Sequence, residues 1–344
     1  MLTATEIVFE FINPEKRPEI ITEVRKLLAQ VNLDYDSQIQ TLLVARHNDQ
    51  LIACAGLDHN VVKCVAMLPS YQGCQLSLKL CEYIQKFAAD KGYNKLFLYT
   101  KPHNEILFRQ CGFYPLVAVP ETLVIMENTP VGIKRYCQQL SALKQDTEAG
   151  AIVMNANPFT RGHLYLVEQA LKQVSWLYIF VVSEDASLFA TKVRYDLVCQ
   201  GVQHLSRVSV ILGSEYLISR ATFPTYFLKT AQQIEQAYLA VDLLMFRNYI
   251  APTLNITQRF VGTEPYSVVT CAYNQAMHKW LTSPTASTVP PIAVHELERL
   301  AIDGDAVSAS RVRKLLAQKD YAAIENLVPP TTWAYLKNNN FSIS

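Results

Sequence analysis

Hydrophobic and polar residues follow two different patterns in the two halves of the chain. From Leu42 to Met126, short apolar runs flank one stretch in which Leu76, Leu80, Ile84 and Phe87 recur at helical spacing. Short strands combined with a helix in this way predict a mixed α/β domain.

The second half alternates continuous apolar runs with helical patterns. The runs that predict strands are 151–154, 176–182, 208–212 and 259–262. The patterns that predict helices are 163–174, 192–205, 225–248 and 267–281. Buried strands joined by crossover helices are typical of a parallel, doubly wound sheet. Ligands bind beyond the carboxyl ends of such strands, so the loop after Met154 is the first candidate site.

A polar break separates the two patterns. Residues 127–130 end the strand pattern, residues 133–143 predict a connecting helix, and a polar stretch follows at 144–148. We therefore expect an N-terminal domain at 1–130, a connecting helix and linker at 131–148, and a C-terminal domain at 149–344.

Composition and charge limit the classes of function. Half of the 344 residues are hydrophobic and 18% are charged, as in globular proteins. The net charge of +1 gives no overall field that attracts nucleic acid or an anionic membrane. The longest apolar run, Trp176 to Val182, is far shorter than the ~20 residues that span a bilayer. We expect a cytoplasmic protein with reduced cysteines and with neither nucleic acid nor membrane as a partner.

The loop after the first C-terminal strand carries the main chemical signal. Residues 155–163 read NANPFTRGH and lead directly into a helix. A glycine lets the backbone approach an anion closely, and a helix N-terminus offers unpaired N–H groups with partial positive charge. The hydroxyl of Thr160 and the imidazole of His163 suit an α-phosphate under attack. The alternative is that His163 only caps or packs on this helix.

A second element of the same kind lies near the C-terminus. Residues 307–313 read VSASRVR, in which Ser308 is suited to cap the following helix. Ser310, Arg311 and Arg313 fall in its first turns. This pattern predicts a second anion-binding helix start, suited to β- and γ-phosphates. An ordinary capped, basic surface helix is the alternative.

Both elements resemble signatures of the nucleotidyltransferase superfamily. Thr160, Gly162 and His163 match its (H/T)xGH motif, and residues 307–313 match its late ISxSxxR element. The resemblance implies ATP handled as its Mg²⁺ complex, without a metal site of protein ligands, and Thr160 and His163 as catalytic residues. The ATP-binding residues that it implies are Asn155, Asn157, Gly162, Ser308, Ser310, Arg311 and Arg313.

A narrower resemblance covers essentially the whole chain. Residues 150–163, 219–229, 261–265, 273–274 and 307–313, with Arg194, together resemble the citrate lyase ligase family. The resemblance implies that acetate attacks the α-phosphate of ATP. The acetyl adenylate would then acetylate the thiol of the dephospho-CoA-derived prosthetic group on the citrate lyase acyl carrier protein, releasing AMP and diphosphate. Candidate contacts to substrate or phosphate, each of which could equally be structural, are Arg194, Arg220, Lys229 and Glu264.

The N-terminal half resembles the GNAT acetyltransferases. Residues 65–77 match their strand, loop and helix, and Gln72 stands at the first position of the (Q/R)xxGx(G/A) loop. Gln75 and Ser77 occupy the positions of two small residues that let the backbone approach a pyrophosphate. We therefore expect a GNAT-like fold without acetyl-CoA-dependent transfer of its own. It would act as a docking module or as a cradle for a CoA-like arm.

Two other classes of function stay open at this point. One is an adenylyltransferase that makes a nucleotide cofactor from a small phosphate ester, and the other is a non-catalytic, acetyltransferase-like binding protein. Only the ligase should respond to acetate in pyrophosphate exchange. Absence of ATP binding would favour the binding protein.

Overall fold

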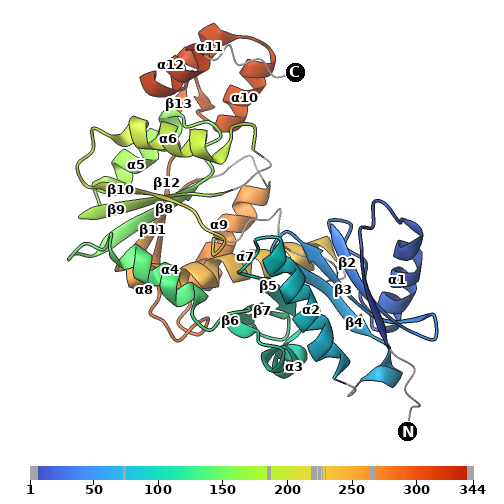
Figure 1. The fold of residues 1–344 in the computed structure, drawn as a ribbon. Helices are drawn as coiled ribbons and strands as arrows, with labels where there is room; N and C mark the ends of the chain where they lie inside the picture. Colours follow the sequence, from blue (N-terminus) through green and yellow to red (C-terminus); the bar gives the residue numbers. More distant parts are fainter. Residues whose placement is uncertain are drawn as a thin grey trace. The chain divides into compact units, whose positions relative to one another are not determined.

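Two compact units make up the chain (Figure 1). The computed structural model describes residues 7–72, 75–183, 187–217, 223, 226, 228, 230–263 and 268–338, leaving aside the side chains of 231 and 268–271. Unit 1 comprises residues 1–134 and 222–241, and unit 2 comprises residues 135–221 and 242–344. The segment 222–241 thus belongs to unit 1, although it lies inside the second half of the sequence. The domain limits expected at 130 and 149 stay a prediction, because a division into compact units does not show which parts of the chain fold independently.

Unit 1 is built on a mixed sheet with the strand order β1-β2-β3-β4-β5-β7-β6. β4 and β5 pair in parallel, through a register that ends at Val62 and Leu98. The strands are β1 (Val8–Ile12), β2 (Thr41–His47), β3 (Gln50–Asp58), β4 (Val61–Met67), β5 (Phe97–Thr100), β6 (Tyr114–Val119) and β7 (Leu123–Glu127). The helices are α1 (Glu19–Gln30), α2 (Leu76–Asp90) and α3 (Glu105–Gln110), with 3₁₀ turns η1 (Pro69–Tyr71) and η2 (Pro102–Asn104).

The helix predicted from the spacing of leucines in the first half is confirmed as α2. Leu76, Leu80, Ile84 and Ala88 lie four residues apart and are all buried. Residues four apart share one face of a helix, so this face packs against the sheet. β3 lies between β2 and β4 and is buried along nearly its whole length, which makes it the centre of the unit 1 core.

Unit 2 contains a parallel sheet with the strand order β10-β9-β8-β11-β12, which confirms the doubly wound class. Its strands are β8 (Ala149–Met154), β9 (Trp176–Val181), β10 (Val208–Leu212), β11 (Ile256–Gly262) and β12 (Ala293–Leu297); β13 (Ala301–Ile302) and β14 (Asp305–Ala306) form a small hairpin. Its helices are α4 (Gly132–Ser141), α5 (Arg161–Leu171), α6 (Thr191–Val202), α7 (Ala231–Met245), η3 (Phe246–Ile250), α8 (Ala251–Thr253), α9 (Val268–Leu281), α10 (Ala309–Ala317), α11 (Tyr321–Glu325) and α12 (Pro330–Asn338). Two of these helices, α4 and α7, begin in residues that belong to unit 1.

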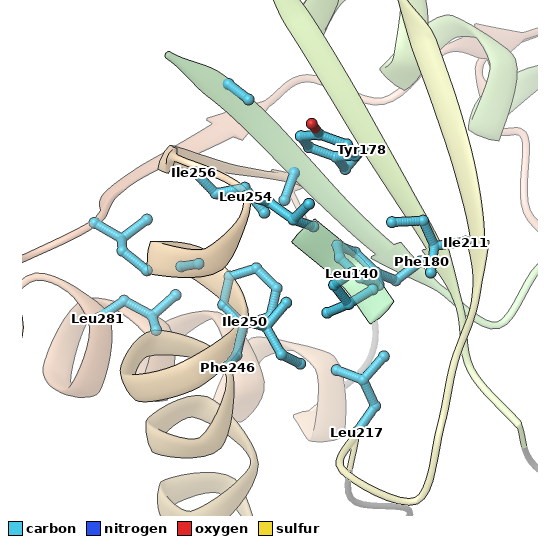
Figure 2. Close-up of a cluster of buried hydrophobic side chains, with 14 of the residues drawn as sticks. Leu140, Tyr178, Phe180, Ile211, Leu217, Phe246, Ile250, Leu254, Ile256 and Leu281 are labelled. Carbon is cyan, nitrogen blue, oxygen red and sulfur yellow. The ribbon is translucent and has the colours of Figure 1, made fainter. Parts of the chain in front are cut away.

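Hydrophobic clusters cover both faces of the unit 2 sheet. Successive side chains of a strand point to opposite faces, so β8 contributes Ala149 and Ala151 to one cluster and Ile152 and Met154 to the other. The first cluster includes residues of α4, η3 and α9 (Figure 2). The second includes residues of α5 and α6. Helices on both faces hold the parallel strands with their carboxyl ends at one edge, where the loop 155–160 begins.

Two details differ from the sequence prediction. The helix expected from residue 225 begins at Ala231. β12 was not predicted, because its AVHEL sequence is at the sheet's edge and mixes polar with partly buried residues. Within the described ranges, no helix combines the length and the apolar character needed to cross a membrane.

Candidate active site

The start of α5 is fixed by a reciprocal pair of hydrogen bonds. Thr160 is the N-cap residue, and its Oγ1 accepts from the backbone N–H of His163 at 3.3 Å. In return, Nδ1 of His163 accepts from the backbone N–H of Thr160 at 3.0 Å. This is a capping box in which a histidine takes the place usually held by Glu or Gln.

The capping box determines the protonation of the His163 ring. Because Nδ1 accepts a hydrogen bond, the proton of the neutral imidazole lies on Nε2. Burial, together with the positive charge of Arg299, lowers the pKa of His163 to about 4. The ring is therefore neutral near pH 7 and offers Nε2–H as a hydrogen-bond donor. Sequence reasoning expected this residue to neutralise phosphate charge; its contact with ATP stays a prediction, and the neutral ring limits it to uncharged hydrogen bonding.

The start of α10 matches the second predicted anion site in its local geometry. Ser308 is the N-cap, and its Oγ accepts from the backbone N–H of Arg311 at 3.2 Å. The hydroxyl of Ser310 lies 3.0 Å from that of Ser308. Nη1 of Arg311 is buried and has no hydrogen-bond partner within the described part of the chain. A buried donor without an acceptor is costly, and a phosphate oxygen would satisfy it.

The two helix starts lie together in unit 2. A Cβ added to Gly162 would stand 2.5 Å from the carbonyl oxygen of Val307, the residue before the α10 cap. Arg313 of α10 donates from Nη1 to the carbonyl oxygen of Asn157, at 2.7 Å. Segments about 150 residues apart in sequence thus form one region with two helix N-termini, as the two motifs predicted.

Arg194 holds the loop from inside the unit. Its side chain is fully buried on α6, and desolvated cations need dense hydrogen bonding. Its acceptors include the carbonyl oxygens of Phe189 (3.0 Å), Asn155 (2.7 Å) and Val182 (2.8 Å), Oδ1 of Asn155 (2.7 Å) and Oγ1 of Thr191 (2.9 Å). These contacts position the loop that carries the candidate site, and the contact of Arg194 with substrate or phosphate stays a prediction.

The two asparagines of the loop also make internal hydrogen bonds. The side-chain amide of Asn155 donates to Oγ of Ser187 at 3.1 Å. Oδ1 of Asn157 accepts from the backbone N–H of Phe189 at 3.1 Å. Both residues therefore stabilise the loop conformation, which includes a cis bond before Pro158. Their contact with ATP stays a prediction.

Packing behind the loop fixes the plane of the His163 ring. Phe159 is buried and stacks on His163 with ring centroids 5.7 Å apart. On α6, Gly201 leaves room for Phe159, because a Cβ there would lie 2.4 Å from the phenyl ring. His163 is thus held by a ring contact as well as by its helix cap.

Sequence reasoning missed Arg299, which lies close enough to His163 to lower its pKa. It follows β12 at the carboxyl edge of the sheet, two residues after Leu297. Its Nε donates to the carbonyl oxygen of Thr263 at 2.6 Å. A charged residue just after a parallel strand is only a weak indication of a functional residue. Arg299 could not be recognised in this way, because β12 itself was not predicted.

Three predicted contact residues, Arg220, Lys229 and Glu264, lie outside the described residues. Their roles stay predictions. Across the described part of the chain, no group of three or more His, Cys, Asp or Glu side chains is placed to hold a metal ion.

Unit 1 contains a cavity of about 520 Å³. It is lined by Ala66 and neighbouring residues of β4, by β5, by Asn104 and Phe108, and by Tyr226. The hydroxyl of Tyr226 donates to the carbonyl oxygen of Tyr99 at 3.2 Å, so the segment 222–241 forms part of the wall. The cavity lies beside the end of the β4–β5 register, at the position of the ligand loop that the sequence predicted.

Gln75 precedes α2 in a left-handed conformation with φ of 55°. This region favours glycine and costs other residues roughly 1–2 kcal/mol. The small residue expected in the GNAT loop pattern is therefore missing at a position where the backbone conformation calls for it. Gly73 and Cys74 of the same loop lie outside the described residues.

These features define two classes of domain. A parallel sheet with two phosphate-suited helix starts at one edge is a nucleotidyltransferase-type domain, and the mixed sheet of unit 1 with its cavity is a GNAT-type fold. Residues 149–336 match the citrate lyase ligase C-terminal domain, and residues 6–113 match the acetyltransferase (GNAT) family.

Curated relatives extend this similarity over nearly the full chain. The citrate (pro-3S)-lyase ligase of Escherichia coli (strain K12) is 46% identical over 319 residues, which cover 92% of this chain and 90% of the relative. That of Klebsiella pneumoniae is 45% identical over 314 residues, 91% of each chain. That of Haemophilus influenzae is 40% identical over 331 residues, 96% of this chain and 98% of the relative. The chain belongs to the citrate lyase ligase family.

Proposed function

We propose that the protein is a cytoplasmic ligase that activates acetate with ATP and acetylates the citrate lyase acyl carrier protein. The observation that carries the proposal is the close approach of Gly162 and Val307, which brings two phosphate-suited helix starts together in a chain of this family. The acceptor is the thiol of the dephospho-CoA-derived prosthetic group. The products are the acetylated carrier protein, AMP and diphosphate.

In the first step, a carboxylate oxygen of acetate attacks the α-phosphorus of ATP. A bond forms between that oxygen and phosphorus, while the bond from phosphorus to the bridging oxygen of the β-phosphate breaks. The electron pair leaves on diphosphate, so the products are acetyl adenylate and diphosphate. Negative charge on the α-phosphate oxygens increases during this attack, and fixed donors that meet this charge lower the barrier.

Residues of the α5 start act at the α-phosphate in this proposal. Nε2–H of His163 donates to an α-phosphate oxygen, and the reciprocal bond with Thr160 keeps the proton on that nitrogen. At the start of α5, the backbone N–H groups of Arg161 and His163 already donate to the carbonyl oxygen of Leu327 and to Oγ1 of Thr160, so the backbone N–H of Gly162 is the one that this proposal directs at the anion. Thr160 itself is 1% exposed, so its main contribution is to orient His163.

Residues of the α10 start hold the leaving diphosphate. Ser310 and Arg311 lie in the first turn after the Ser308 cap, and the buried Nη1 of Arg311 lacks an acceptor among the described residues. Arg313 already contacts the loop through Asn157 and follows one turn later. Arginine suits phosphate because its planar donors bind two oxygens at once.

Magnesium enters as the ATP complex in this proposal. Phosphates and water supply most of its ligands, because Mg²⁺ keeps several waters and few protein carboxylates. The ion would spread charge on the polyphosphate, while the chain's own residues orient it.

In the second step, the carrier thiol attacks the acetyl carbonyl carbon of the adenylate. A carbon–sulfur bond forms, the bond from carbon to the phosphate oxygen breaks, and the thiol proton passes to solvent as AMP leaves. We assign the unit 1 cavity to the CoA-like arm that carries this thiol, because its volume of about 520 Å³ is in the range of small-molecule pockets. The same unit would then raise the local concentration of the thiol.

Pyrophosphate exchange tests the proposal against the adenylyltransferase alternative. With labelled diphosphate, ATP and Mg²⁺, acetate should start the exchange of label into ATP, since acetyl adenylate formation is reversible. Small phosphate esters such as phosphopantetheine should not start it. Exchange that responds to a phosphate ester and ignores acetate would overturn the proposal.

A further inference from the structure

The side chain of Arg299 lies across the carboxyl end of β11. A Cβ on Gly262, the last residue of β11, would stand 3.5 Å from both Cγ and Nε of Arg299. Nε of Arg299 also donates to the carbonyl oxygen of Thr263 at 2.6 Å. β11 lies between the edge strand β12, which Arg299 follows, and β8, whose carboxyl end begins the loop 155–160.

Backbone contacts connect Arg299 to the start of α5 by a second path. The carbonyl oxygen of Leu300 accepts from the backbone N–H of Val307 at 2.9 Å. The carbonyl oxygen of Val307 in turn faces Gly162, next to His163. The charge of Arg299 also contributes to the lowered pKa of His163, which agrees with this placement.

The candidate site needs a cation near the α-phosphate, because His163 is neutral at pH 7. Arg194 is buried under the loop, and its Nε and Nη1 already donate to Phe189, Val182 and the loop residue Asn155. The side chain of Arg161 is held at another segment, because its Nε donates to the carbonyl oxygen of Val328 at 3.1 Å. Arg313 lies on α10, where the proposed function places the diphosphate.

We propose that Arg299 contacts the α-phosphate of ATP and stabilises the negative charge that develops there when acetate attacks. The inference rests on the proposed function and adds a catalytic residue to it. At the α-phosphate, Nε2–H of His163 would be the neutral hydrogen-bond donor and Arg299 would supply the positive charge. The Nε contact to Thr263 fixes the guanidinium before ATP binds, so little reorganisation is needed during the reaction.

Two substitutions separate charge from structural support. Arg299→Met removes the cation, and Arg299→Lys keeps the charge but loses the planar donor that bonds to Thr263. Acetate-dependent exchange should fall about 10²- to 10³-fold in Arg299→Met, mostly in kcat, and Arg299→Lys should recover part of it. Arg207 provides a matched control, because it also donates to main-chain carbonyl oxygens, of Leu171 and Val174, beside the amino end of β10. Arg207→Met should lower the thermal transition and leave kcat unchanged.

Phosphorothioate ATP identifies the phosphate that Arg299 contacts. In the wild-type protein, one diastereomer of ATPαS should react much more slowly than the other, because sulfur replaces the oxygen that Arg299 contacts. This preference should shrink in Arg299→Met, whereas ATPβS should show no such change. Separately, NMR titration of Arg299→Met should show the pKa of His163 rising toward its ordinary value.

The outcomes distinguish this inference from the proposed function. If the wild-type protein shows acetate-dependent exchange but Arg299→Met retains wild-type kcat, Arg299 has no catalytic role. Equal losses in Arg299→Met and Arg299→Lys, with an unchanged preference between ATPαS diastereomers, would assign it a purely structural role and overturn the inference. If the wild-type protein itself shows no acetate-dependent exchange, the proposed function fails first.

Discussion

The carbonyl oxygen of Val307 faces the α-carbon of Gly162 so closely that a Cβ at residue 162 would stand 2.5 Å from it. Real Cβ atoms do not approach backbone oxygen this closely, so one of the two segments must move if a side chain is added. The glycine of the TxGH motif therefore has a packing role at the contact between the two segments. The relationship explains why the two motifs occur together, since each one completes the environment of the other.

Gly162→Ala should separate the starts of α5 and α10. We expect overpacking of about 1–3 kcal/mol in the free energy of unfolding and at least a tenfold loss of exchange activity. Urea unfolding and pyrophosphate exchange measure the two effects. Gly262→Ala is the control for urea unfolding alone, because a Cβ there meets Cγ and Nε of Arg299 at an ordinary 3.5 Å. Wild-type stability and exchange in Gly162→Ala would contradict the packing account.

His163 has a structural and a chemical role that two substitutions can separate. His163→Ala removes half of the capping box, which should cost roughly 0.5–2 kcal/mol, and should slow exchange about 10²- to 10³-fold. His163→Gln keeps a side chain that can accept from the backbone N–H of Thr160. It should therefore restore most of the stability but not the rate of pyrophosphate exchange. Thermal unfolding and exchange on the same preparations provide the comparison. Full exchange activity in either variant would exclude His163 from catalysis.

The pKa of His163 gives a pH dependence of defined sign. Because the pKa is lowered to about 4 in the folded chain, the unfolded chain binds more protons between pH 4 and about 6.5. The contribution of His163 to stability is therefore fully present above pH 6.5 and is lost as the pH falls toward 4. NMR titration, assigned with His163→Gln, should show no protonation of this ring between pH 8 and 5.5. A midpoint near 6.5 would contradict its burial beside Arg299.

Much of this site could be predicted because the residues that begin a helix are determined by their neighbours in sequence. Thr160, Gly162 and Ser308 follow from cap chemistry and from a glycine at a fixed offset, which neighbouring residues alone determine. The burial of Arg194 could not be predicted, because it depends on tertiary packing of α6 under the loop. Arg299 was missed for a related reason, since its position depends on the pairing of β12 with β11.

In the fold too, features that depend on neighbouring residues could be predicted, whereas features that depend on contacts between distant residues could not. The alternation of apolar runs with helical patterns was sufficient for the parallel sheet of unit 2. The assignment of residues 222–241 to unit 1 depends on contacts such as Tyr226 with Tyr99, more than a hundred residues apart. No local pattern contains that information. Separating the two halves near residue 147 would divide this segment from its own unit, so point substitutions are the better test.

Filling the unit 1 cavity should affect transfer and spare activation. Ala66 lines the cavity, and Ala66→Phe should obstruct the CoA-like arm. We expect acetylation of citrate lyase to slow at least about tenfold, equivalent to roughly 1.4 kcal/mol, with unchanged acetate-dependent exchange. Ala118→Phe, on an exposed position of β6, is the control and should change neither. Thermal transitions verify folding. Normal acetylation of citrate lyase by a folded Ala66→Phe protein would show that the cavity has no role in the transfer step.

The most direct test of the account follows both products of one reaction. The protein is incubated with ATP, Mg²⁺ and labelled acetate, with and without deacetylated citrate lyase, and AMP and protein-bound label are measured together. The account predicts label on the carrier protein thiol, one AMP for each acetyl group bound, and loss of both when acetate or ATP is omitted. Label that reaches citrate lyase without formation of AMP, or AMP that remains attached to an acceptor, would contradict it.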